Sequence, residues 1–260
     1  MRIVFIGAGR LATNLAPALS AASHQIVQVF SRSMQSAVAL AGIVGAEAVD
    51  SLAAVTDEAD VFIFSVTDTA LPQLAAQLCR GREKCIFLHT AGSVPLSVFA
   101  QGVNSYGVLY PMQTFSKERR VDFKRLTFFI EGNDERALAV ARTLAASVSN
   151  SVVELSSEDR RHLHLAAVFA CNFANHCYEL SAEILERHGL TFDVMLPLID
   201  ETAAKVHGLS PREAQTGPAV RFDESVMQAQ LQLLCDQPRL AEVYEVMSKS
   251  IHQSHIQKAL

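Results

Sequence analysis

A Gly-Ala-Gly turn at residues 7–9 is the stretch whose spacing points most directly to chemistry. It follows a short β-branched run, Ile3–Ile6, that is typical of a strand buried on both faces, and it precedes leucines at helical spacing. Gly7 allows a tight turn, Gly9 lets a pyrophosphate approach the backbone, and the small Ala12 lets the helix pack closely on the strand. The free N–H groups at the start of that helix attract phosphates. This stretch therefore predicts a dinucleotide-binding elbow.

The end of the second predicted strand, Gln25–Phe30, indicates which dinucleotide is bound. An NAD site usually carries an acidic residue there for the ribose 2′-hydroxyl. This chain instead has Ser31, Arg32 and Ser33. Arg32 can bind a 2′-phosphate and the serines can donate to it, which favours NADP. The alternative is a solvated arginine that opens a helix.

Three later loops, Ser65–Asp68, His89–Gly92 and Tyr110–Thr114, each follow a predicted strand. In a doubly wound sheet these loops face one crevice, because ligands lie beyond the carboxyl ends of the strands. His89 is a candidate catalytic residue, or a histidine satisfied at a strand end. Gln113 is a candidate substrate ligand, or a turn residue. Together with the elbow, the motifs predict these cofactor residues: Gly7, Ala8, Gly9, Arg10, Leu11, Ser31, Arg32, Ser33, Ser65, Val66, Thr67, Thr90 and Ala91.

The pattern of predicted secondary structure changes at Ser156. Strands and helices alternate before it, which predicts an α/β fold with a Rossmann-type, mostly parallel sheet over residues 1–155. After it, a capping pattern opens a helix of about thirty residues, and further helices follow to the end. We therefore expect an all-helical domain over residues 156–260. A helix so long and apolar cannot bury itself in so small a domain, and this predicts a homodimer formed through residues 156–260.

The composition excludes several function classes. The formal net charge of −5 gives no basic surface for nucleic acid or anionic membrane, and no apolar run is long enough to span a bilayer. The five cysteines are odd in number and include no Cys-x-x-Cys pair, so free thiols and a cytoplasmic protein are expected. No metal site is predicted.

Six motifs in order carry a family resemblance: Gly-Ala-Gly-Arg-Leu-Ala, Ser-Arg-Ser, His-Thr-Ala-Gly-Ser-Val, Tyr-Pro-Met-Gln-Thr-Phe-Ser, His-Leu-Ala-Ala-Val-Phe-Ala-Cys-Asn (164–172) and Thr-Gly-Pro-Ala-Val-Arg (216–221). Together they resemble a bacterial family of NADP-dependent oxidoreductases with a Rossmann-like N-terminal domain and a helical C-terminal domain of unassigned function. The chain is more distantly similar to pyrroline-5-carboxylate reductase, ketopantoate reductase and the β-hydroxyacid dehydrogenases. The resemblance implies an inter-domain crevice and a dimer, but no substrate.

One departure from the distant relatives concerns proton transfer. The ketopantoate reductases and β-hydroxyacid dehydrogenases carry Lys-x-x-x-Asn on the first long helix. If Asn172 is that asparagine, Val168 stands at the lysine position, and no lysine occurs between Lys124 and Lys205. His164 is a candidate replacement, since histidine suits acid–base work near neutral pH. The alternative is that His164 and Asn172 are both structural.

These features favour hydride transfer between NADPH and a small carbonyl or imine compound, with an anionic substrate as one option. Residues 216–221 could hold a carboxylate or phosphate, or form a structural loop; the resembling family tends to have glycine where Phe222 stands. Two alternatives are a non-catalytic NADP(H) sensor and a deazaflavin-dependent reductase on the same scaffold.

Overall fold

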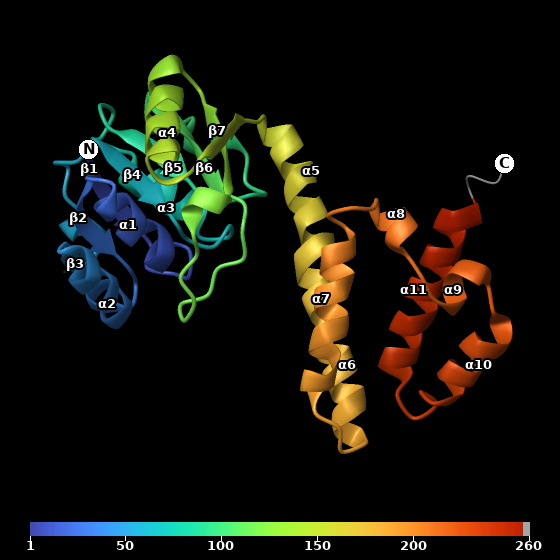
Figure 1. The fold of residues 1–260 in the computed structure, drawn as a ribbon. Coiled ribbons are helices and arrows are strands. Elements are labelled where there is room, and N and C mark those ends of the chain that lie inside the picture. Colours follow the sequence, from blue (N-terminus) through green and yellow to red (C-terminus); the bar gives the residue numbers. More distant parts are fainter. Residues whose placement is uncertain (257–260) are drawn as a thin grey trace. The chain divides into compact units, whose positions relative to one another are not determined.

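A computed structural model describes residues 1–256 of the 260-residue chain. It divides into two compact units, Met1–Cys171 and Asn172–Leu260 (Figure 1). The first unit is an α/β domain, and the second consists of helices and connecting loops. The predicted fold class, a Rossmann-type sheet followed by an all-helical part, is confirmed.

The first unit contains an eight-stranded sheet with strand order β3-β2-β1-β4-β5-β6-β7-β8. Every neighbouring pair is parallel except β6 and β7, which are antiparallel. This order reverses direction beside β1, which is where a doubly wound sheet binds its ligand. The strands are β1 (Arg2–Ile6), β2 (Gln25–Phe30), β3 (Glu47–Val49), β4 (Val61–Phe64), β5 (Ile86–His89), β6 (Ser105–Pro111), β7 (Thr127–Gly132) and β8 (Ser151–Glu154).

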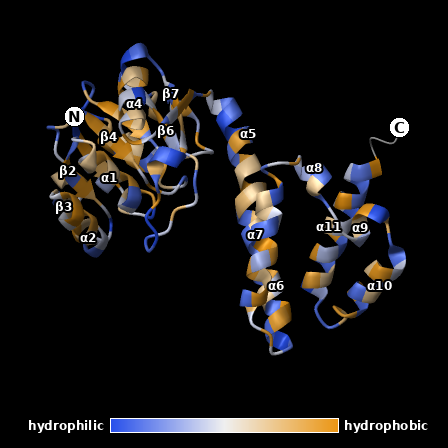
Figure 2. Cartoon of the chain, viewed as in Figure 1, coloured by the Kyte–Doolittle hydropathy of each residue, from blue (hydrophilic) through white to orange (hydrophobic). Residues whose placement is uncertain are grey.

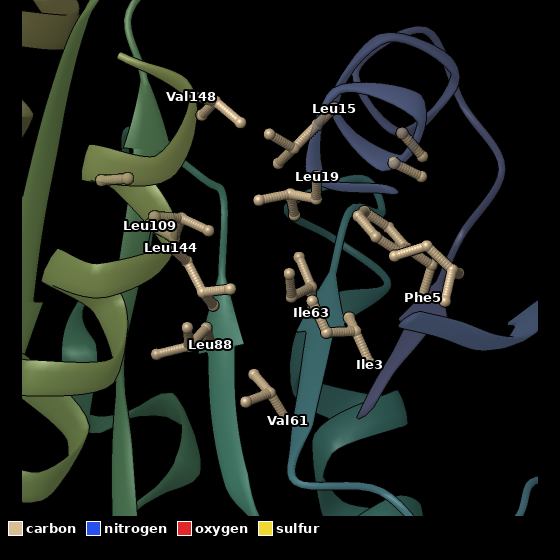
Figure 3. Close-up of a cluster of buried hydrophobic side chains, with 14 of the residues drawn as sticks. Ile3, Phe5, Leu15, Leu19, Val61, Ile63, Leu88, Leu109, Leu144 and Val148 are labelled. Carbon is tan, nitrogen blue, oxygen red and sulfur yellow. The ribbon is translucent and has the colours of Figure 1, made fainter. Parts of the chain in front are cut away.

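Helices cover both faces of this sheet. α1 (Ala12–Ala21), α2 (Met34–Val44) and α4 (Glu135–Val148) pack on one face, and α3 (Leu71–Leu78) with the 3-10 turn Leu96–Phe99 packs on the other. Successive residues of β1 alternate between the two cores, with Ile3 and Phe5 on the α1 side. Figure 3 shows this side of the core, where leucines of α1 and α4 meet residues of β1, β4 and β5.

Local capping explains where several helices begin. Ser33 accepts a hydrogen bond from the Ser36 N–H at the start of α2, and Asp134 accepts one from Ala137 at the start of α4. Ser156 does the same for α5 (Ser157–Ala167) through the Asp159 N–H. The sheet therefore ends, and continuous helical structure begins, at Ser156, where the sequence pattern changes.

The long predicted helix is interrupted by a π-helical segment, Val168–Phe173, between α5 and α6 (Ala174–Arg187). The boundary between the two compact units falls within this segment, at Cys171. α5 belongs to the first unit because the fully buried Arg160 binds Glu131 of β7 and the Val94 carbonyl. The change in sequence pattern at Ser156 marks the end of the sheet, but it does not predict the contacts by which Arg160 attaches α5 to the first unit.

The second unit is helical throughout and has a small core. Its helices are α6, α7 (Leu196–Lys205), α8 (Pro211–Ala214), α9 (Pro218–Arg221), α10 (Glu224–Gln232) and α11 (Pro238–Ile256), with a 3-10 turn at Phe192–Met195. A capping box at Ser210 opens α8, and the helix lasts one turn. Leu180, Leu234 and Leu240 form the buried cluster. Figure 2 shows hydrophobic residues spread along α6, α7, α10 and α11.

Two absences are found within residues 1–256. No helix there is both long and apolar enough to cross a membrane. No group of three or more His, Cys, Asp or Glu side chains in that part of the chain could hold a metal ion.

Candidate functional site

The glycine elbow is fixed between two neighbouring strands. The Gly7 N–H donates to the Phe30 carbonyl at 2.8 Å, and the Ser65 N–H donates to the Ile6 carbonyl at 2.8 Å. Gly7 has φ of +109°, and a Cβ built on it would lie 2.2 Å from the Ser65 oxygen. Only glycine fits this position. The elbow thus brings the α1 N-terminus directly to the edge of the sheet.

A cavity of about 570 Å³ lies at this edge, within the first unit. Every predicted cofactor residue except Ser33 lines it. Its wall also contains residues outside the predicted cofactor set: Phe30, Ser36, Asp68, Ala70, Leu74, Gly92, Tyr110 and Lys117. The elbow, the helix N-terminus and the cavity's size are those that a dinucleotide needs.

The β2 end of the cavity is where the sequence predicts the 2′-phosphate of NADP. Ser31, Arg32 and Ser36 line it, and Arg32 is exposed. Within residues 1–256 no carboxylate lies within ion-pair distance of Arg32. Ser33 is outside the lining residues, because its hydroxyl caps α2 instead. Ser36, one turn further along the chain, lines the cavity at this end instead.

We expect Arg32→Ala to weaken NADPH binding by about ten- to a hundredfold, because a charge-assisted bond to phosphate is lost. NADH, which has no 2′-phosphate, should bind almost unchanged. Fluorescence titration with both nucleotides measures the two dissociation constants. Arg80→Ala, at an exposed position outside the cavity, is the control and should alter neither. Equal losses for NADPH and NADH would contradict the assignment.

His164 and Tyr110 form a hydrogen-bonded pair at the end of the cavity remote from β2. The Tyr110 hydroxyl lies 3.1 Å from His164 Nδ1, and both residues line the cavity. Gly92 backs the ring so closely that a Cβ there would lie 2.5 Å from Nδ1. Within residues 1–256 the Nε2 atom has no hydrogen-bond partner. The Tyr110 hydroxyl therefore engages Nδ1, and Nε2 stays available to a ligand.

Burial keeps the Tyr110 hydroxyl protonated. The side chain is 8% exposed, and this desolvation raises the pKa of Tyr110. The positive charge of Arg160 lowers that pKa and the negative charge of Asp68 raises it, both with smaller effect. At neutral pH the hydroxyl can donate to Nδ1 of a neutral His164 or accept from a protonated one.

His89 lies in a different environment from His164. It is fully buried in the sheet, is not among the cavity's lining residues, and packs near the Phe99 ring. Its Nδ1 accepts from the Ala91 N–H at 3.2 Å. Its Nε2 is buried and has no hydrogen-bond partner in the described part of the chain. His89 is therefore enclosed at the strand end with one ring nitrogen paired, away from the cavity that contains His164.

The other two candidates are not in this cavity's wall. Gln113 is exposed, lines a neighbouring cavity together with Ser116 and Arg119, and accepts from the Thr114 N–H through its own side chain. Asn172 is exposed, lies in the π-helical segment and begins the second unit. The structure thus brings Tyr110, rather than Gln113, to His164.

The Thr-Gly-Pro-Ala-Val-Arg motif belongs to the second unit. Gly217 has φ of +111°, and Phe222, the residue that follows α9, adopts a left-handed conformation with φ of +54°. The Phe222 ring stacks on His252 at a centroid distance of 4.1 Å. Glycine would adopt that conformation without strain, whereas here Phe222 adopts it with its ring against His252.

Comparison with known proteins matches both parts of the chain. The family described as coenzyme F420-dependent NADP oxidoreductase matches residues 2–88, and a domain of unknown function (DUF2520) matches residues 126–251. Among curated proteins, none matches the sequence.

Solved structures give a stronger relation. The crystal structure of a "putative NADP oxidoreductase" from Bacteroides fragilis is 51% identical, with a TM-score of 0.93 over 97% of this chain and 98% of that one. Two others share the fold at 15% identity. An imine reductase from Myxococcus stipitatus in complex with NADP+ has a TM-score of 0.69, covering 98% of this chain and 94% of that one. A 1-pyrroline-5-carboxylate reductase from Streptococcus pyogenes has a TM-score of 0.63, covering 97% and 98%.

The identity to the Bacteroides protein extends over nearly the whole of both chains. The N-terminal match and the elbow geometry agree with it. The chain therefore belongs to this family of NADP oxidoreductases.

Proposed function

We propose that this protein reduces a small carbonyl or imine compound with NADPH, and that His164 handles the proton. The observation that carries the proposal is the His164–Tyr110 pair in the same cavity as the glycine elbow and Arg32. A dinucleotide whose 2′-phosphate lies at the β2 end and whose pyrophosphate lies at the elbow extends toward that pair. The names of the imine reductase and pyrroline carboxylate reductase relatives support the substrate class.

The residues of this chain divide the remaining work. When bound, NADPH supplies the hydride. His164 Nε2–H donates a proton to the substrate oxygen or nitrogen, so the C=O or C=N bond becomes C–O–H or C–N–H. Because the transferred proton leaves from Nε2, the Nδ1–H donates to the Tyr110 oxygen both before and after donation. This unchanged hydrogen bond keeps the ring in the same orientation in both protonation states.

We expect His164→Ala to lower kcat by about 100-fold or more, the usual contribution of a positioned acid or base. The assay is NADPH oxidation with a compound found active in a carbonyl and imine panel, and NADPH affinity should stay unchanged. His162→Ala is the matched control. His162 lies on the same helix, is exposed and does not line the cavity. An unaltered kcat in His164→Ala would remove the assigned role.

Two further variants separate positioning from chemistry. Tyr110→Phe should lower kcat by about tenfold, since it removes only the hydrogen bond that orients the ring. Gly92→Ala should have a comparable effect, because the added methyl displaces His164.

Asn172 stays a candidate from its sequence position alone, and Asn172→Ala tests it in the same assay. Its kcat should fall without a change in NADPH affinity.

The same assays distinguish the alternative functions. Tight NADPH binding without turnover across the panel would favour an NADP(H) sensor. Turnover only with a deazaflavin as hydride acceptor would favour a deazaflavin-dependent reductase, which the match of residues 2–88 supports.

We also propose that the protein is a homodimer through its helical part. Within the described second unit, few apolar side chains are buried and many are exposed, including Leu190, Val194, Leu196, Leu198, Leu233 and Val246. Apolar surface of this extent marks an interaction site, and a stable dimer would bury more than roughly 2,000 Å².

The five free cysteines also favour a reducing compartment such as the cytoplasm.

Light scattering at micromolar concentration should give twice the 28.3 kDa chain mass. Leu198→Glu should shift the protein toward monomer, because a carboxylate is costly to bury. Ile43→Glu, which changes a similarly exposed apolar residue of the first unit, should leave the dimer intact. A wild-type monomer would contradict this proposal.

A further inference from the structure

Lys117 enters the cofactor cavity from a segment that the dinucleotide motifs do not include. It follows the Tyr-Pro-Met-Gln-Thr-Phe-Ser motif, in the loop between β6 and β7. It is the residue of that loop that lines the same cavity as Gly9 and Arg10, while Ser116 and Arg119 line the neighbouring one. Within residues 1–256, no carboxylate lies within ion-pair distance of the Lys117 amine. Its charge is therefore available to a ligand.

One buried side chain ties this loop to the elbow. Asn14, in the first turn of α1 and 8% exposed, donates through Nδ2 to the Arg10 carbonyl and to the Ser116 carbonyl, both at 2.9 Å. Its Oδ1 accepts from the Val121 N–H at 3.2 Å. The amide thus closes the loop at both ends and holds it against the turn that starts α1. The Asn14 side chain thus links Ser116, the residue before Lys117, directly to the Arg10 backbone at the glycine elbow.

The cavity's charges suit a highly anionic ligand. Arg10, Arg32 and Lys117 line it, against one carboxylate, Asp68. Arg32 lies at the β2 end, where the 2′-phosphate is expected, whereas the Asn14 tie places the Lys117 loop beside α1. The helix N-terminus there offers N–H groups but no acidic residue in its first turn.

We propose that Lys117 binds the pyrophosphate of NADP and that Asn14 positions it for this contact. The proposal rests on the proposed placement of the cofactor in this cavity. Lys117 is the binding residue, and Asn14 acts through it. The loop then works as a strap across the phosphates, held at the elbow by the Asn14 amide.

The experiment is a fluorescence titration of the full-length protein with NADPH and with NADH. Lys117→Met keeps the side-chain stem and removes the charge. It should raise the dissociation constant for both nucleotides by the same factor, about tenfold, because both carry the pyrophosphate. Arg119→Met is the matched control from the same loop and should change either constant by less than about twofold, since Arg119 faces the other cavity.

A double-mutant cycle tests the positioning role of Asn14. Asn14→Ala should also weaken both nucleotides, and adding Lys117→Met to it should cost much less than Lys117→Met alone. A merely structural role for Asn14 would give factors that multiply. Multiplying factors would therefore overturn the positioning claim.

Other outcomes overturn the pyrophosphate assignment. Unchanged constants in Lys117→Met would remove Lys117 from the cofactor site. Loss confined to NADPH would place it at the 2′-phosphate. Unchanged constants with a raised KM for an anionic substrate would give the amine to the substrate instead. Failure of the wild-type protein to bind either nucleotide would contradict the proposed function itself, which is a distinguishable result.

Discussion

Arg160→Met is expected to lower the free energy of unfolding by about 3 to 5 kcal/mol, the usual cost of removing one partner from a buried ion pair. Arg160 is fully buried, and its guanidinium donates to Glu131 at 2.5 Å and to the Val94 carbonyl at 2.6 Å. Ser157 also donates to Glu131 through its backbone and hydroxyl groups. The substitution leaves the carboxylate and the carbonyl without their main partner, and α5 loses its attachment to the sheet.

Urea denaturation followed by circular dichroism measures this loss. Arg142→Met is the matched control, because Arg142 pairs with Glu154 on the surface, where both side chains are about half exposed. Exposed pairs contribute about 1 kcal/mol or less. Similar losses in the two variants would show that the Arg160 network does not fix α5.

His89 is expected to make the protein lose stability as the pH falls from about 6.5 to about 3. Complete burial, with a smaller contribution from the positive charge of Arg160, lowers the pKa of His89 to about 3, and the nearby Pro95 carbonyl opposes this shift. The folded-state pKa is below the unfolded value, so the unfolded chain binds the extra proton within this window. Stability then rises with pH by about 1.4 kcal/mol per unit from this one group, and its contribution is constant outside the window.

His89→Asn removes the titration and keeps an oxygen that can accept from Ala91. The free energy of unfolding, measured by urea titration between pH 6.5 and 4.5, should fall less steeply in the variant by about 1.4 kcal/mol per pH unit. The slope is the test, because a constant loss of packing shifts both ends equally. Parallel curves would show that His89 titrates alike in the folded and unfolded chain.

Local sequence patterns predict most of the fold of the first unit. β1 is apolar from Ile3 to Ile6 because both its faces are covered there, and Gly7 must be glycine because the Ser65 carbonyl leaves no room for a Cβ. Such signals are confined to a few consecutive residues. The π-helical interruption at Val168–Phe173 carries no comparable signal, because small, aromatic and β-branched residues fit α and π backbones alike.

The candidate site shows the same limit. Cofactor residues follow from strand ends, which neighbouring residues define. Tyr110 and His164 are 54 residues apart, and only the packing of α5 against the sheet brings them together. His89 and Tyr110 both end parallel strands in the sequence pattern, yet one is enclosed in the core and the other reaches the cavity. The depth of each side chain depends on the covering elements, which the pattern of one strand does not encode.

In the turn that follows β2, Arg32 can be exchanged freely, whereas Ser33 is constrained because it caps α2. Arg32 is exposed and makes no contact that the fold requires, so a change there to an acidic residue would alter nucleotide preference with little effect on folding. Ser33 holds the first turn of α2, and its loss would cost about 1 kcal/mol. Relatives that exchange NADP for NAD are therefore expected to differ at position 32 while keeping a capping residue at position 33, and a designer who wishes to reverse the preference should begin with that single position.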